Sequence, residues 1–151
     1  MTKDEMKNFD PDKNFVSVQD KLSEYAGTNP ESTSIICDDK IYSYKMLDEQ
    51  SDKIAAALHK ICPQITKESL VLFVLNRSFY VPAVIFGILK TGAAFIPQTP
   101  EIPAERIKYS MKDSKSPLLI TSEKIRQKKP ELEDASYKIC SLLSRTFCLV
   151  L

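Results

Sequence analysis

Hydrophobic residues along this chain change spacing several times, and the changes mark three strands separated by two helices. Residues 70–75 are an unbroken apolar run, as expected of a strand that is covered on both faces. Residues 93–96 and 117–121 are two further short apolar runs, which we interpret as a second buried strand and a third strand. The segments between them, residues 79–91 and 103–114, are long enough for crossover helices, which imply parallel strands and right-handed connections. The pattern therefore predicts an α/β fold: part of a doubly wound parallel sheet, in the order strand, helix, strand, helix, strand.

Local signals predict where these two helices begin and end. Ser78 is expected to cap the first helix with its hydroxyl, and Pro82 lies near enough to the start to be tolerated. Gly92 is expected to end it, because glycine readily adopts the left-handed backbone of a helix terminus. The second helix is expected to open at Pro103, where a missing N–H costs little, and to end near Ser114.

A helix, a small hairpin and a longer helix are predicted before the first strand. One side of the short helix is formed by Val16, Val18, Leu22, Tyr25 and Ala26, and Gly27 followed by Pro30 ends it. Residues 34–37 and 40–43 are β-prone runs joined by Asp38 and Asp39, which suit a tight turn. Ser43 is then expected to cap a helix with apolar residues at helical spacing, which Pro63 ends.

The chain divides into three predicted regions. Residues 1–14 are polar and charged without a sustained period, and we expect them to be a flexible leader. Residues 15–122 hold the helix, the hairpin and the partial sheet. Residues 123–151 are a tail that fits the pattern poorly, with a charged helix or linker at 123–129 followed by apolar segments.

The composition and charge of the chain argue against nucleic-acid binding and membrane association. A hydrophobic fraction of 43% and a charged fraction of 27% are ordinary for a globular protein, and a net charge of +1 provides no basic surface for nucleic acid. The longest apolar stretch, residues 79–96, is interrupted by Pro82, Lys90 and two glycines, so no membrane association is expected. The N-terminus lacks a signal-peptide pattern, and a cytoplasmic location is predicted.

Metal and nucleophile chemistry also lack support in the sequence. The four cysteines at positions 37, 62, 140 and 148 form no CxxC pair, and the lone His59 cannot complete a zinc site. We expect free thiols, and a His59 that lies near a helix C-terminus, where an imidazolium interacts favourably with the helix dipole.

Several short segments, taken in order, carry a more specific signal. They are Tyr25–Pro30 (YAGTNP), Ser43–Leu47 (SYKML) with the alanine-rich 54–58, Leu75–Ser78 (LNRS), Ile88–Pro97 (ILKTGAAFIP), Ile102–Ser114 (IPAERIKYSMKDS) and Leu118–Thr121 (LLIT). In this order they resemble the signatures of adenylation domains of nonribosomal peptide synthetases, which are AMP-forming, adenylate-forming ligases. The resemblance covers roughly residues 15–122 and departs at Gln98-Thr99-Pro100, where the family prefers Leu-Asp-Pro.

The resemblance implies a parent reaction and its partners. Complete domains of this family use ATP and magnesium to convert an amino acid into an acyl-adenylate, which is then transferred to a carrier-protein thiol. Their phosphate-binding loop, TSGTTGKPKG, does not follow Thr121, and the three glycines at 27, 87 and 92 are not clustered. The family's distal acidic motifs and late lysine are also missing. For this chain alone we therefore predict no catalytic, cofactor-binding or metal-binding residues.

Three interpretations remain open. The chain can be the N-terminal part of an adenylation domain that is not catalytic by itself, with the remainder of the domain and a carrier protein as partners. It can instead be a non-catalytic remnant, or half of a split protein that pairs with a separately encoded remainder. A third interpretation, an independent small nucleotide-binding domain, lacks GxGxxG or another phosphate cradle.

Four positions have both a functional and a structural interpretation. Lys90 can be a phosphate ligand, but a lysine in a last helical turn is expected to interact with the helix dipole and point to solvent. Arg77 follows a strand and can meet a nucleotide, but a structural salt bridge is the simpler expectation. Glu105 and Arg106 are expected on a solvated helix face or in a local ion pair.

Overall fold

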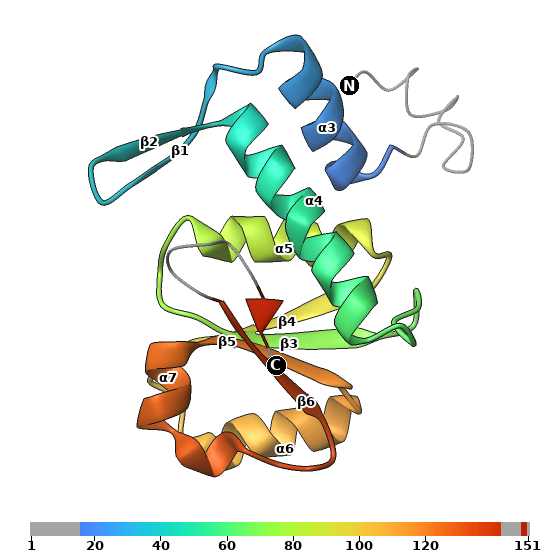
Figure 1. The fold of residues 1–151 in the computed structure, drawn as a ribbon, viewed down its shortest axis with the longest axis vertical. Helices are drawn as coiled ribbons and strands as arrows, with labels where there is room; N and C mark the ends of the chain where they lie inside the picture. The colour runs from blue at the N-terminus through green and yellow to red at the C-terminus, as the bar shows by residue number, and fades with distance from the viewer. Residues whose placement is uncertain (1–15, 143–148, 151) are drawn as a thin grey trace, which may run out of the picture.

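The computed structural model describes residues 16–142 and 149–150, which form a sheet with helices on both faces and a helix–hairpin unit beside it (Figure 1). The predicted leader at residues 1–14 lies outside the described residues. The sheet has the strand order β4-β3-β5-β6-β7. Its strands are β3 (Leu70–Val74), β4 (Ala94–Gln98), β5 (Leu118–Ser122), β6 (Lys138–Leu142) and β7 (Leu149–Val150).

The first four strands of this order are parallel, which confirms the predicted fold class. Helix α5 (Tyr80–Lys90) joins β3 to β4, and α6 (Ala104–Ser114) joins β4 to β5. The two helices cover opposite faces of the sheet (Figure 1). The prediction of strand, helix, strand, helix, strand is therefore correct, and β7 adds an antiparallel pairing on β6.

Strand β3 explains why both faces are apolar. Val71 and Phe73 belong to the core under α4 and α5, while Leu72 and Val74 belong to the core on the α6 side. All four side chains are almost fully buried. A central parallel strand that is covered on both faces must be apolar at successive positions, which is the pattern that identified it.

The helix–hairpin unit forms as its local signals predict. Its elements are α3 (Val18–Thr28), β1 (Thr33–Cys37), β2 (Lys40–Ser43) and α4 (Tyr44–Ile61). The Ser43 hydroxyl accepts a hydrogen bond from the Met46 N–H at 3.3 Å and caps α4. Asp38 and Asp39 both have positive φ, 50° and 59°, as a two-residue hairpin turn requires.

Two expectations around α5 are wrong. Ser78 does not cap this helix, because its hydroxyl donates to the Asn76 carbonyl and the helix begins at Tyr80 without a side-chain cap. Strand β4 is not buried on both faces, because it lies at the sheet edge and exposes Ala94 and Pro97. Proline is tolerated in an edge strand, where no neighbour needs its missing N–H. Gly92 follows the end of α5 with a φ of 85°, the left-handed conformation that was predicted to end this helix.

Part of the poorly patterned tail joins the fold. The charged segment contains α7 (Glu123–Lys128), which Ser122 caps by accepting from the Ile125 N–H, and a short 3₁₀ turn η1 (Pro130–Leu132) follows. The next apolar segment supplies β6, which pairs in parallel with β5 along its whole length. Residues 143–148 and 151 lie outside the described residues.

A close helix contact and an ion cluster hold α4 against α5. A Cβ added at Gly87 would lie 2.5 Å from the Ile54 Cγ2 atom and 3.2 Å from the Ser51 carbonyl oxygen, so only glycine allows this approach. At the end of α5, the Lys90 Nζ atom donates to Asp48 Oδ1 at 2.7 Å, to Asp52 Oδ1 at 2.6 Å and to the Asp48 carbonyl oxygen at 3.3 Å.

Lys90 therefore does not point to solvent, contrary to the expectation from its position in the last turn. Its side chain is only 12% exposed. Asp48 and Asp52 are four residues apart on α4, so their carboxylates lie on one face of that helix and meet the lysine together. The Ser23 hydroxyl also donates to Asp48 at 2.8 Å, which extends the cluster to α3.

Replacing Gly87 with alanine is expected to destabilise the chain by about 1–3 kcal/mol, because the new methyl group overpacks the contact with Ile54. Gly27→Ala is the matched control. A Cβ at Gly27 meets nothing within 4 Å, so this change should be neutral or stabilising by up to about 1 kcal/mol. Urea unfolding measures the change in unfolding free energy for each substitution. Equal changes for the two would contradict the close-contact argument.

Lys90→Met should cost about 1–3 kcal/mol of unfolding free energy, because it leaves the partly buried Asp48 carboxylate without its ammonium partner. Asp52→Asn should cost less than about 1 kcal/mol, since Asp52 is 63% exposed and Asp48 retains Lys90. Urea midpoints of the two variants test this order. A larger loss for Asp52→Asn would show that the cluster is organised around Asp52 instead.

Candidate functional site

The carboxyl edge of the sheet contains a topological switch point between β3 and β5. The chain leaves β3 toward β4 on one side, whereas β5 and β6 continue on the other side. Connections that diverge in this way open a crevice at the carboxyl ends of the strands, where open α/β sheets bind ligands. A hollow of about 440 Å³ lies here. It is lined by Leu75, Asn76, Ser78, Tyr80, Ser122, Glu123, Lys124 and Leu142.

Side-chain hydroxyls brace the two strands that border this crevice. The backbone register of β3 and β5 pairs only Leu72 with Leu119 and Phe73 with Ile120. Beyond the amino end of this ladder, the buried Ser116 hydroxyl accepts from the Leu72 N–H at 3.2 Å and donates to the Leu118 carbonyl at 2.9 Å. At the carboxyl end, Thr121 donates to the Val74 carbonyl at 3.1 Å. The edge is therefore rigid, and the Thr121 hydroxyl donates to protein rather than to a ligand.

The polar groups at the switch point can orient a ligand but do not form a phosphate cradle. Asn76 and Lys124 are exposed there and also line an adjoining hollow of about 240 Å³. Sequence reasoning did not single out either residue, although Asn76 directly follows the predicted strand 70–75 and Lys124 comes three residues after the predicted strand 117–121. A cradle needs several backbone N–H groups that approach the phosphates closely, usually from glycines. Gly27 lies in α3, Gly87 faces Ile54 inside α5, and Gly92 lies in the turn before β4.

Lys90 is equally unavailable as a phosphate ligand. An ammonium group has three hydrogen-bond donors, and the contacts with Asp48 and Asp52 use all of them. The structural interpretation of this residue is correct in kind, but its partners are carboxylates rather than a helix dipole and water.

Arg77 lies at the rim of a second hollow, of about 560 Å³, beside the carboxyl ends of β3 and β4. Its side chain is exposed, and it makes no ion pair with any residue that the structure describes. The expected structural salt bridge is therefore not found within residues 16–142. The walls of this hollow are mainly apolar and come from β1, β3, β4 and the first turn of α5.

The remaining charged, imidazole and thiol side chains that the sequence analysis discussed lie in positions without an evident ligand-binding role. Glu105 and Arg106 are exposed on α6, and His59 is exposed in the last turn of α4, as expected. Cys37 and Cys62 are free thiols, and burial raises the pKa of Cys62, with an opposing effect from the Lys138 charge. Cys148 lies outside the described residues. Within the described part, no three carboxylate, thiol or imidazole groups are placed to hold a metal ion.

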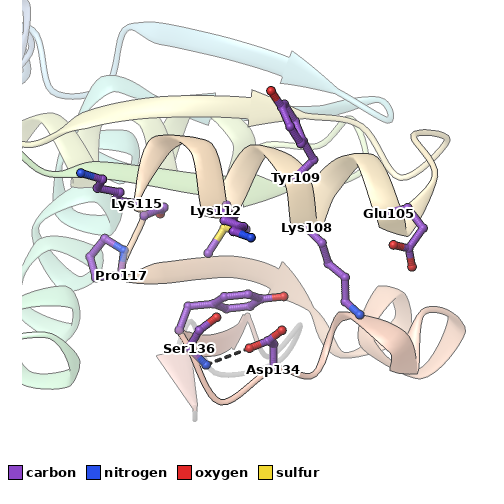
Figure 2. A pocket seen from close by; sticks show the side chains of 11 residues that line it. Glu105, Lys108, Tyr109, Lys112, Lys115, Pro117, Asp134 and Ser136 are labelled. Atoms are coloured by element: carbon purple, nitrogen blue, oxygen red, sulfur yellow. Dashed lines mark hydrogen bonds between the residues drawn. The ribbon is translucent and has the colours of Figure 1, made fainter.

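A larger groove, of about 850 Å³, lies at the opposite edge of the sheet between α6 and the turn before β6 (Figure 2). Lys108, Lys112 and Lys115 line it, but Lys108 and Lys115 extend toward opposite ends, so their charges do not converge (Figure 2). Burial, with smaller effects from Asp134 and Glu133, raises the pKa of Tyr137 to about 12. Because this is the amino edge of the parallel strands, we do not assign the functional site to it.

The prediction that this chain has no catalytic, cofactor-binding or metal-binding residues stays a prediction.

Among residues 16–142, none of the helices combines the length and the apolar character that crossing a lipid bilayer requires.

Known protein families identify the chain. A model of the family described as AMP-binding enzyme matches residues 22–147, past the point at which the sequence signatures end. The dimodular nonribosomal peptide synthase of Bacillus subtilis (strain 168) is 38% identical over 117 residues, which is 78% of this chain and 5% of that protein. Tyrocidine synthase 2 of Brevibacillus parabrevis is 38% identical over 112 residues, or 74% of this chain and 3% of that protein.

Solved structures share the fold. NpsA-ThdA, an artificially fused adenylation–PCP di-domain from Klebsiella oxytoca, superimposes with a TM-score of 0.72 at 23% identity over 87% of this chain and 23% of its own. The N-terminal subdomain of Klebsiella oxytoca NpsA in complex with 3-hydroxybenzoyl-AMSN gives 0.71 at 22% identity, over 88% of this chain and 31% of its own. This chain thus spans a small part of its relatives. It belongs to the AMP-binding enzyme family and corresponds to the N-terminal part of a nonribosomal peptide synthetase adenylation domain.

Proposed function

We propose that this chain supplies the structural N-terminal part of a domain that activates an amino acid and is not catalytic by itself. In the complete domain a carboxylate and ATP, with magnesium, give an acyl-adenylate and pyrophosphate, and the acyl group then passes to a carrier-protein thiol. The partners are the remainder of the domain and the carrier protein. A cytoplasmic location, where ATP is available, agrees with this role.

The single observation that carries this proposal is that the described residues form no backbone cradle for phosphates at the carboxyl edge of the sheet. The carboxyl ends of β3 and β5 form the switch point, and the Thr121 hydroxyl bonds the two strands together there. Each of the three glycines has a place elsewhere, and Lys90 is bound by two carboxylates. Stabilising an adenylation transition state needs preorganised donors around the phosphates. The chain therefore provides a platform on which other residues perform the chemistry.

A second candidate is a half of a split protein that pairs with a separately encoded remainder. The outer edge of β6 favours it, because β7 pairs there only with Ser141 and Leu142 among the described residues. On this side, the backbone of residues 138 and 139 pairs with no strand among the described residues, and an unpaired strand edge is a template for association. A non-catalytic remnant would have the same open edge but no partner.

The isolated chain is expected to show no amino-acid-dependent exchange of pyrophosphate into ATP with any of the twenty amino acids, because the phosphate-binding donors are missing. The exchange assay measures this directly, with an intact adenylation domain as the positive control. Adding the separately expressed remainder of a relative's domain tests the split-protein candidate. Exchange by the isolated chain would overturn the main proposal, and exchange only with the added remainder would favour the second.

A chimera tests the platform role. Residues 22–142 replace the matching segment of the dimodular synthase of Bacillus subtilis, with which this chain is 38% identical. We expect the chimera to retain exchange with the amino-acid preference of its host, because the segment supports the site without selecting the substrate. The same chimera carrying Gly87→Ala should fold less stably and lose activity at a lower temperature. A folded chimera with a different amino-acid preference would contradict a purely structural role.

A further inference from the structure

The hollow beside Arg77 has the composition of a ligand pocket. We call it the hairpin pocket, because residues of β1 form one of its walls. The other walls come from the carboxyl ends of β3 and β4 and from Val81 and Pro82 at the start of α5. Its volume of about 560 Å³ lies within the range of roughly 300–1,000 Å³ for small-molecule sites. It is separate from the switch-point hollow, although the two share Leu75 and Ser78.

The walls of the hairpin pocket are held in place. The Tyr42 ring stacks on Phe79 with centroids 4.0 Å apart and planes 9° apart, which anchors the hairpin to the start of α5. The turn at Asp38 and Asp39 keeps β1 and β2 in register. A ligand would therefore meet a largely preformed site, and binding would not require the hairpin to fold first.

Apolar surface dominates this pocket. Five of its apolar lining residues are Ile35, Ile36, Phe73, Val81 and Pro97. Ile36 is 70% exposed, although large aliphatic side chains are normally buried. Covering this side chain with an apolar ligand would remove that surface from water, which is the main driving force for apolar binding.

One charged side chain, Arg77, lies beside this apolar surface. Among the described residues that line the hairpin pocket, Arg77 alone is charged, and it makes no ion pair within that part of the chain. A guanidinium presents two parallel N–H groups that match the two oxygens of a carboxylate. Among the described residues, no acidic side chain lines the pocket to compete for these donors. The charge therefore favours an anionic head group, and the walls favour an apolar body.

We propose that the hairpin pocket binds a small carboxylate with an apolar body, whose carboxylate pairs with Arg77 and whose body lies against Ile35, Ile36 and Val81. The site uses only residues of this chain and does not depend on the adenylation function. An aliphatic acid and an aryl acid share this chemistry. Octanoate and 3-phenylpropionate are the probes that distinguish the two.

The test is titration of the full 151-residue chain with each acid, measured by calorimetry and by ¹H–¹⁵N chemical shifts. Octanamide is the neutral ligand control, since it has the same chain without the charge. We expect octanoate or 3-phenylpropionate to bind more tightly than octanamide and to shift the amides of residues 35–37 and 81. No binding by either acid up to its solubility limit would overturn the proposal, as would shifts confined to the switch-point hollow.

Two variants and a matched control separate the contribution of the Arg77 charge to ligand binding from that of the apolar contacts. Arg77→Gln should weaken acid binding at least about tenfold and leave octanamide binding unchanged. Arg106→Gln removes an equally exposed arginine from α6, away from the pocket, and should change neither. Ile36→Ser, at an exposed position that is not needed for folding, should weaken the acids and octanamide alike.

Other results would reject the proposal. Equal affinity of Arg77→Gln and the unsubstituted chain for octanoate would remove the charge argument. Sedimentation velocity adds one further outcome. A dimer that Ile36→Ser dissociates would show that a second copy of the chain, rather than a small carboxylate, covers this surface.

Discussion

The burial of β3 on both faces is the constraint on which the other elements depend. Val71 and Phe73 require cover from one side, and Leu72 and Val74 require it from the other. Helices α4 and α5 supply the first layer, and α6 with α7 supplies the second (Figure 1). With β3 central, β4 and β5 must lie on opposite sides of it, and this arrangement creates the switch point. Both hollows at the carboxyl edge therefore follow from the position of one strand.

The contact between α4 and α5 shows how close packing and charge act together. Gly87 lets the two helices approach until Ile54 fills the space that a side chain would take. Lys90, one turn farther along α5, then reaches Asp48 and Asp52 on the neighbouring helix. Charged groups that are partly removed from water stabilise a structure only when they are well paired, so this cluster favours one relative position of the helices. The motif around Lys90 and Gly92 is in this sense an architectural element.

The carboxyl edge of the sheet shows which features of a ligand site this part of the adenylation domain contains. The strand ends form the edge at which α/β proteins bind ligands, but the described residues form no glycine-rich backbone cradle for phosphates there. Arg77 is different, because nothing in the described part of the chain neutralises it and an apolar pocket lies beside it. Lysines also line the groove on the opposite edge, but Lys108 and Lys115 extend toward opposite ends of it (Figure 2), so their charges do not converge on one point as a ligand charge would require.

Local pattern by itself determined the three strands around α5 and α6, the hairpin turn at Asp38 and Asp39, the Ser43 cap and the turn at Gly92. Each of these depends on the conformational preferences of a few neighbouring residues. The ordered signatures also identified the family. Only the tertiary structure decided that β4 is an edge strand, that β6 extends the sheet and that Ser78 bonds to Asn76 instead of capping α5. The same is true of Lys90, whose partners lie 42 and 38 residues away, and of Arg77, whose surroundings come from three separate segments. Such contacts are decided by how whole elements pack, because side chains distant in sequence meet only after the sheet and its layers have formed.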